Sequence, residues 1–246
     1  MSAFEIAACV VAIAIGVVVK AVTGMGFPLV AIPVISLFAS VEDAVTVIAL
    51  PNVVMNAVIC WRMRREMVHT RDLPVLAVTC AVGAVIGVGL LVRLPEQLLM
   101  VGLAVTVLAY VAYVASSPQS KLSPRIGRLG SPLVGLVAGV MQGAVGISGP
   151  PVAAWIHAHR WPPGAFVFAV SLLFFVGGAI QLVLLVGHGM VTGPRLWISL
   201  PAIPFVLVMI PIGERMRARL GAHRFDRAVL ALLLLSGVSL IVRALR

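Results

Sequence analysis

Two segments rich in glycine and proline interrupt long apolar stretches of this chain, and their residue types suit anion binding. They are Thr23-Gly24-Met25-Gly26-Phe27-Pro28 and Gly146-Ile147-Ser148-Gly149-Pro150. Proline cannot continue a helix but starts one well, so each segment predicts a helix end and a new short helix near Pro28 or Pro150. A helix start leaves N–H groups unpaired and carries about half a positive charge, and glycine lets a ligand approach the backbone. Two such starts predict a site for a small anion.

Lys20 adds a positive charge to the first segment. It lies four residues before Gly24, closer to a break than any other Lys or Arg, and an offset of 122 residues pairs it with the polar Gln142. A charge in the middle of a bilayer costs about 2.5–3.5 kcal/mol, so it is rarely without a role. Two interpretations stay open: Lys20 contacts the anion, or it ends a helix and extends its ammonium to the lipid headgroups.

Further polar side chains occur near the breaks and in the next apolar stretch. The hydroxyls of Thr23 and Ser148 can donate to an anion or satisfy backbone groups freed by the breaks. Asn52 and Asn56 are four residues apart and share one helix face, which favours a helix contact over a cavity lining. Weaker candidates of the same kind lie in the second half of the chain: Ser171 and Gln181.

We expect no metal site, cofactor or catalytic centre. His157 and His159 are only two residues apart, a poor spacing for metal ligands on a helix, and the three cysteines form no CxxC pair. The sequence around Ser148 also matches GxSG, the nucleophile motif of rhomboid proteases, which makes an intramembrane serine protease the alternative enzyme. A serine nucleophile needs a nearby histidine, and no histidine lies in the middle of an apolar stretch. A non-transporting subunit of a membrane complex is a further alternative, but it leaves the two breaks unexplained.

The composition requires a membrane protein. Hydrophobic residues make up 61% of the 246 residues and charged residues 11%, whereas soluble domains are about half apolar and about a quarter charged. Eight apolar stretches lie at about residues 3–38, 42–61, 73–92, 97–115, 131–156, 163–186, 195–213 and 226–243. A spanning helix needs about 20 residues, so six stretches fit one crossing, and the two longest contain the breaks. We expect an all-α polytopic fold with about ten helical membrane segments.

The chain carries signs of an internal duplication. The two breaks are 122 residues apart, and other landmarks keep nearly that offset: Met67-Val68 with Met190-Val191, Leu73 with Leu196, and Gly89 with Gly213. We expect two transmembrane repeats at residues 1–115 and 131–246, joined by a cytoplasmic linker at residues 116–130. Broken helices in inverted repeats are a known transporter design.

The distribution of positive charge predicts how the chain crosses the membrane. If each broken stretch goes in and comes back, 13 of the 18 Lys and Arg residues fall in loops on one side, as cytoplasmic loops do. A single crossing would put the Arg-rich loops 62–71 and 214–227 on opposite sides. The first arrangement gives each half five segments, opposite orientations and outward termini. The net charge of +10 therefore reflects topology, and we expect no nucleic-acid partner.

Taken together, the breaks resemble those of the sulfite exporter TauE/SafE family, also called TSUP. The residues that carry the resemblance are Thr23-Gly24-Met25-Gly26-Phe27-Pro28-Leu29-Val30-Ala31-Ile32-Pro33, Gly139-Val140-Met141-Gln142-Gly143-Ala144-Val145-Gly146-Ile147-Ser148-Gly149-Pro150-Pro151, Asn52, Asn56 and Gly213-Glu214-Arg215. The resemblance implies a multi-pass secondary transporter of the bacterial inner membrane for sulfite, sulfonates or small carboxylates. No acidic residue lies deep in an apolar stretch to carry a proton, which favours export or facilitated diffusion.

Small residues predict where helices pack closely. Gly83, Gly87 and Gly89 suit a close helix contact, either within one chain or between two copies in a homodimer. The other expected partners are the lipid bilayer and the small anionic substrate.

Overall fold

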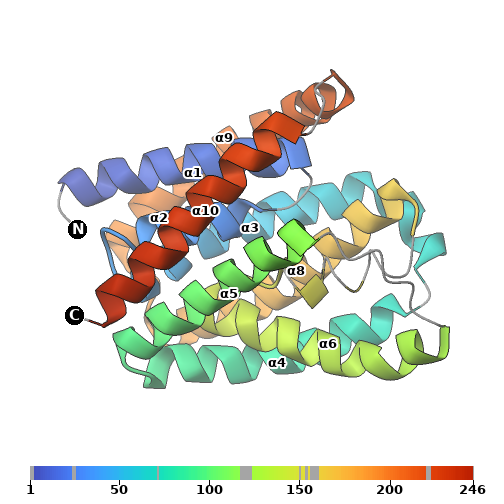
Figure 1. Cartoon of the computed structure of the whole chain (residues 1–246), viewed down its shortest axis with the longest axis horizontal. Coiled ribbons are helices and arrows are strands. Elements are labelled where there is room, and N and C mark those ends of the chain that lie inside the picture. Colours follow the sequence, from blue (N-terminus) through green and yellow to red (C-terminus); the bar gives the residue numbers. More distant parts are fainter. Residues whose placement is uncertain are drawn as a thin grey trace.

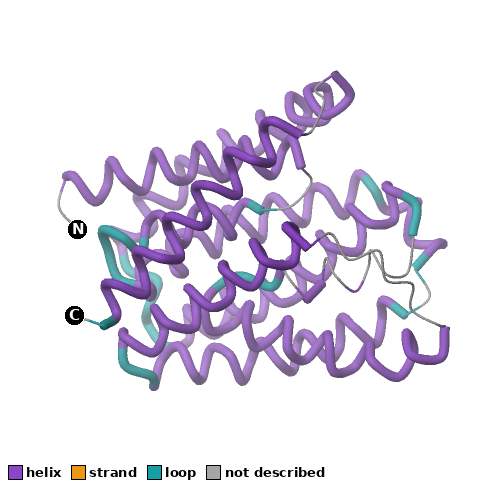
Figure 2. Tube along the Cα trace, viewed as in Figure 1, coloured by secondary structure: helices purple, strands orange, loops and turns teal. Residues whose placement is uncertain are grey.

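The computed structural model describes residues 3–23, 26–70, 72–116, 124–149, 151–152, 155, 161–219 and 223–245. Within these ranges helices are joined by short loops and no strand is present, which confirms the predicted all-α class (Figure 2). The helices are α1 (Ala3–Thr23), α2 (Phe27–Ile35), α3 (Val41–Arg62), the 3₁₀-helix η1 (Arg64–His69), α4 (Leu73–Arg93), α5 (Glu96–Ser116), α6 (Pro124–Val145), α8 (Pro163–Gly187), α9 (Gly193–Arg219) and α10 (His223–Ala244).

The helices have the length and surface of membrane segments. Five of the six stretches predicted to cross once contain helices that are long and apolar enough to do so, and they belong to α3, α4, α5, α8 and α9. Along α4, large apolar side chains face outward instead of into the protein: Val75, Val78, Val82, Val85 and Ile86. Lipid is the solvent that accepts such a surface, so the chain is a multi-pass membrane protein.

The chain turns back at the first break. In Figure 1, α2 runs antiparallel to α1, and both chain termini lie at one end of the molecule. We call this the terminal end, which also holds residues 36–40 and 188–192, and we call the end with residues 63–72 the opposite end. The nine residues of α2 rise only about 13 Å, so α2 is a half-helix that does not cross a bilayer alone.

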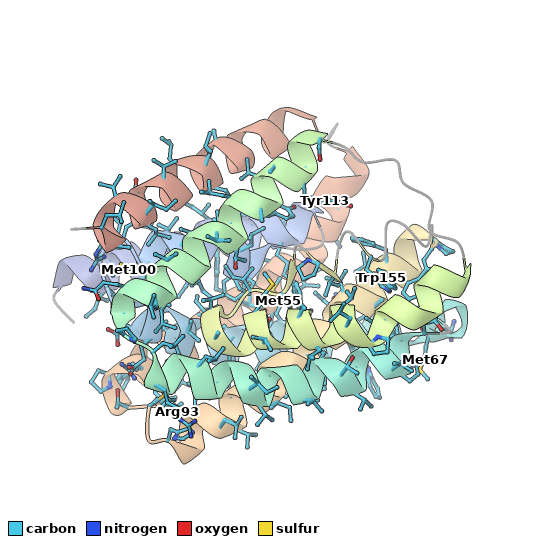
Figure 3. The ribbon with its side chains drawn as sticks, turned by 60° about the horizontal axis from the view of Figure 1, so that its bottom comes forward. Met55, Met67, Arg93, Met100, Tyr113 and Trp155 are labelled. Atoms are coloured by element: carbon cyan, nitrogen blue, oxygen red, sulfur yellow. The ribbon has the colours of Figure 1, made fainter. Side chains whose placement is uncertain are left out.

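Figure 3 marks the two ends and the interior between them. Met67, just before α4, lies at the opposite end, and Arg93, the last residue of α4, lies at the terminal end. Met55 of α3 lies between them and is fully buried. Buried polar side chains flank Met55 at Asn52 and Asn56, so the polar groups of α3 are at mid-depth in the helix bundle.

Helix contacts come in matching sets. α4 packs on α6 and on α8, while α9 packs on α1 and on α3. The offset of 122 residues approximately matches α1 with α6, α3 with α8, α4 with α9 and α5 with α10. Under this exchange the contacts of α4 correspond to those of α9, and the contacts between α3 and α8 and between α5 and α10 correspond to themselves. Such packing is what two related halves with a pseudo-twofold axis would give.

Glycines allow the closest of these contacts, between α4 and α6. A Cβ atom on Gly83 would lie 2.2 Å from the carbonyl oxygen of Leu136, and one on Gly87 would lie 2.3 Å from that of Val140. Three glycines of α6 are equally tight against α4: Gly135, Gly139 and Gly143. The predicted close contact of Gly83 and Gly87 is therefore made inside one chain. Gly89 takes no part, because a Cβ there would meet nothing within 4 Å.

Arginines at the terminal end have protein partners. Arg195 of α9 bonds Glu42 and Asp43 at the start of α3 at 2.9 and 2.6 Å. Arg243 of α10 donates to the backbone oxygen of Ser36, at the C-terminus of α2, at 2.7 Å. These two positive charges lie outside the Arg-rich loops because they stabilise helix ends and join distant helices.

Candidate substrate-binding site

The two breaks meet in the interior and share one cavity. At each break a glycine takes a left-handed backbone that other residues rarely adopt: φ is 110° at Gly26, the N-cap of α2, and 72° at Gly146, just after α6. The cavity has about 10 Å³, room for about one water molecule. Its lining consists of Gly26, Pro28, Leu29, Gly146, Ile147, Ser148, Gly149 and Phe174.

Lys20 lies beside this cavity with its ammonium buried. Its side chain is 1% exposed, and Nζ donates to Oδ1 of Asn56 at 2.5 Å. The same nitrogen lies 5.1 Å from the centre of the Phe174 ring. Its described contacts include no carboxylate, so the Lys20 amine is held by a neutral amide and an aromatic face. Lys20 therefore points into the bundle and not toward the headgroups.

Asn56 is fixed by its neighbour on α3. Its Nδ2 donates to the backbone oxygen of Asn52 at 2.7 Å and to Oδ1 of Asn52 at 2.8 Å. With both amide hydrogens used, Oδ1 of Asn56 is turned toward Lys20. The two asparagines on one helix face thus contact another helix, as their spacing favours, and orient the ammonium.

A second, neutral network lies beside the other break. Nε2 of Gln181 in α8 donates to the backbone oxygens of Gln142 and Gly143 at 2.7 and 3.2 Å. Gln142 in turn donates to Oε1 of Gln181 at 3.2 Å and accepts from the hydroxyl of Ser148 at 3.0 Å. The backbone oxygen of Gln142 also accepts from the backbone N–H of Gly146 at 2.9 Å, so Gln181 adds a second donor there and supplies a donor to the Gly143 oxygen near the end of α6.

The family model for the sulfite exporter TauE/SafE matches residues 8–240, nearly the whole chain. The chain belongs to the sulfite exporter TauE/SafE family. Comparison with curated proteins and with solved structures gives no significant match. As a TauE/SafE protein, the chain is a membrane transporter of the anion-exporter type and not an enzyme.

The TauE/SafE chain brings most of its predicted site residues together. Those of the breaks that line the cavity are Gly26, Pro28, Gly146, Ile147, Ser148 and Gly149, and those beside it are Lys20, Asn52, Asn56 and Gln142. Phe27 instead packs against α1 and does not line the cavity, because its ring carbon Cδ2 would lie 3.1 Å from a Cβ on Gly16. Ser171 is buried, and its hydroxyl finds no hydrogen-bond partner in the described structure.

Other predictions fall outside the described part of the TauE/SafE chain. These are Gly24, Met25, Pro150, His157 and His159, together with the side chain of Thr23. Among the residues that are described, no group of three His, Cys, Asp or Glu could hold a metal ion.

The serine protease alternative is wrong for this TauE/SafE protein. The hydroxyl of Ser148 donates to the Gln142 side chain, which is not a base that could activate it. The GxSG match instead has a backbone cause, since Gly146 turns the chain with a positive φ.

Sequence reasoning missed Phe174 and undervalued Gln181. Both lie in α8, which shows no break, and an aromatic residue in an apolar stretch looks like ordinary core. A signal was present for Gln181, because a buried amide in a membrane helix requires a partner. No comparable signal marked Phe174.

Proposed function

We propose that this protein carries a small monovalent or divalent anion across the bacterial inner membrane, binding it between the two breaks. Sulfite, small sulfonates and small carboxylates are the candidate substrates. The observation that carries the proposal is a buried ammonium beside a cavity lined by two glycine breaks, with no carboxylate partner among the residues that the structure describes. An anion would supply the missing negative charge and the acceptors for N–H groups at the start of α2.

The binding energy has two physical sources. A buried charge without a counter-charge is costly, so an anion that enters beside Lys20 relieves that cost. The ammonium has three N–H donors, and the described contacts use one of them for Asn56. Charge-assisted hydrogen bonds of this kind contribute about 1.5–3 kcal/mol each.

Alternating access between inverted halves explains how a site in the interior exchanges its anion. The supporting observation is that contacts between the halves occur at both ends. At the terminal end Arg195 bonds Glu42 and Asp43, and at the opposite end the Glu66 carboxylate lies against the first turn of α8, since a Cβ on Gly164 would be 2.7 Å from its Cδ. Breaking one set while the other holds would open one end at a time.

The direction that fits is export. With the cell interior negative, each negative charge that leaves gains about 2.3 kcal/mol per 100 mV, so an anion leaves without a coupled ion. The carboxylates that the structure describes near the path, Glu42, Asp43 and Glu66, are at the ends and not beside the cavity. They are poorly placed to carry a proton through the centre.

The test begins with the purified protein. A ligand that binds the folded state at 100 times its Kd stabilises it by about 2.7 kcal/mol, so a thermal-shift screen of sulfite, thiosulfate, sulfonates and carboxylates identifies the anion. Flux of the best ligand is then measured in liposomes for the wild type, for Lys20→Met and for Arg93→Met, a control that removes an exposed cation at the end of α4. We expect flux in the wild type and the control and its loss in Lys20→Met. Equal flux in all three proteins would show that Lys20 does not take part in anion binding.

A further inference from the structure

Phe174 contacts both the cavity and Lys20. Its ring lines the cavity between the two breaks, and the same ring lies 5.1 Å from the Lys20 ammonium. On the side of the second break, a Cβ on Gly149 would lie 3.8 Å from the ring carbon Cζ. Lys20 itself is not among the residues that line the cavity. The ring therefore occupies space between the cavity and the ammonium.

The rest of that face of α8 also points at the site. Ser171, Phe174 and Gly178 follow each other at helical spacing, so they share one face. Gly178 lies against α3, where a Cβ would be 3.6 Å from Nδ2 of Asn52. Ser171 carries a buried hydroxyl without a described hydrogen-bond partner. This face of α8 thus carries a hydroxyl without a described partner, an aromatic ring and a glycine that is closely packed against α3.

The space available is too small for the anions in question. Sulfite has four heavy atoms and sulfonates have more, whereas the cavity has room for about one water molecule. An anion can reach the ammonium only if the Phe174 ring moves aside. The ring holds Lys20 by a cation–π contact, which is weaker than a charge-assisted hydrogen bond to an anion. An arriving anion therefore displaces the ring and takes its place on the ammonium.

We propose that Phe174 determines the size of the anions this site accepts, by filling the space that the substrate must occupy beside Lys20. This inference rests on the proposed function. The ring keeps the empty site dry and shields the ammonium, and when displaced it packs against the apolar part of the ligand. A smaller side chain at this position leaves more room for the part of the anion that lies away from its charge.

The experiment uses a series of alkylsulfonates that differ in length but not in charge. Methanesulfonate and 1-propanesulfonate are tested as inhibitors of flux in liposomes, with the anion that the wild type moves fastest. The variants are Phe174→Ala, Phe174→Leu and Phe174→Trp. Phe168→Ala is the matched control, because Phe168 is also a buried phenylalanine of α8 but does not line the cavity.

The quantity compared is the inhibition ratio, defined as the inhibitory potency of 1-propanesulfonate divided by that of methanesulfonate. We expect Phe174→Ala to raise this ratio about tenfold relative to the wild type, as one or two methylenes in a pocket allow. Phe174→Leu should change the ratio in the same direction by less, Phe174→Trp should lower it, and Phe168→Ala should leave it unchanged. If Phe174→Ala does not fold, Phe174→Leu and Phe174→Trp decide, because they keep most of the buried volume.

Two negative results have different meanings. Wild-type flux with the same inhibition ratio in every Phe174 variant would overturn this inference and leave the proposed function standing. Absence of flux of any tested anion in the wild type would overturn the proposed function, and this inference with it.

Discussion

Each break contains a glycine with a positive φ, but the polar surroundings of the two breaks differ. Beside the first break, Lys20 brings an ionisable amine whose described hydrogen bonds use only one of its donors. Beside the second break, a neutral network forms hydrogen bonds within the protein, and its members are Gln142, Gln181 and Ser148. The difference continues on the facing helices, where the 122-residue offset pairs Asn52 with Phe174. The first half thus offers the charge to the ligand, while the second half provides a neutral hydrogen-bond network and the ring of Phe174.

The largest expected effect comes from disturbing the packing of α4 against α6. In Gly87→Leu even the Cβ atom would lie 2.3 Å from the Val140 carbonyl oxygen, so α4 and α6 must separate to make room for the side chain. We expect a loss of stability of about 3 kcal/mol or failure to fold, as for severe overpacking. Thermal unfolding in detergent measures it. Gly89→Leu is the control, because nothing lies within 4 Å of a Cβ there; equal melting of the two variants would contradict the tight contact.

Exchanging the polar residues of the two breaks tests whether the halves are interchangeable. Lys20→Gln removes a charge-assisted contact and should lower kcat/KM for the anion by on the order of 100-fold. The double variant Lys20→Gln with Gln142→Lys should not recover, because a lysine at position 142 finds neither Asn56 nor Phe174. Flux in liposomes is the measurement. Recovery in the double variant would show that the site needs only one charge in either half.

Substituting one amide side chain beside each break distinguishes a role in ligand binding from a role in stability. Asn56→Ala removes the described hydrogen-bond acceptor of Lys20 and should raise KM about tenfold. Gln181→Leu removes the side-chain donor to the Gly143 carbonyl and should lower stability by about 1–3 kcal/mol with little change in KM. Flux kinetics and thermal unfolding are compared for both proteins. The opposite pattern would mean that the second break, and not the first, holds the ligand.

The smallest effect is expected at the terminal end. Arg195→Gln breaks the contacts with Glu42 and Asp43, whose side chains are 41% and 24% exposed, so it should cost no more than about 1 kcal/mol of stability. The flux rate should change less than about threefold, with a smaller dependence on salt than in the wild type. A loss of flux as large as that of Lys20→Gln would place the critical charge at the end and not at the breaks.

Local sequence determined the fold class and the positions of the breaks. Apolar stretches of spanning length can form only helices in lipid, because the backbone must satisfy its own hydrogen bonds there. The interruptions of those helices are marked by glycine, since few other residues adopt a positive φ: Gly26, followed by Pro28, in the first break and Gly146 in the second. The position of Lys20 four residues before a break was sufficient to single it out.

Tertiary structure alone decided which side chains share the site. Phe174 is 154 residues from Lys20, and no periodicity within α8 distinguishes it from the other apolar residues there. The partners of Gln181 on α6 and of Gly83 and Gly87 across the α4–α6 contact likewise depend on how the helices cross. In a membrane every helix surface is apolar, so the hydrophobic pattern that orients helices in soluble proteins is lost. Close backbone contact and buried hydrogen bonds select the neighbours instead.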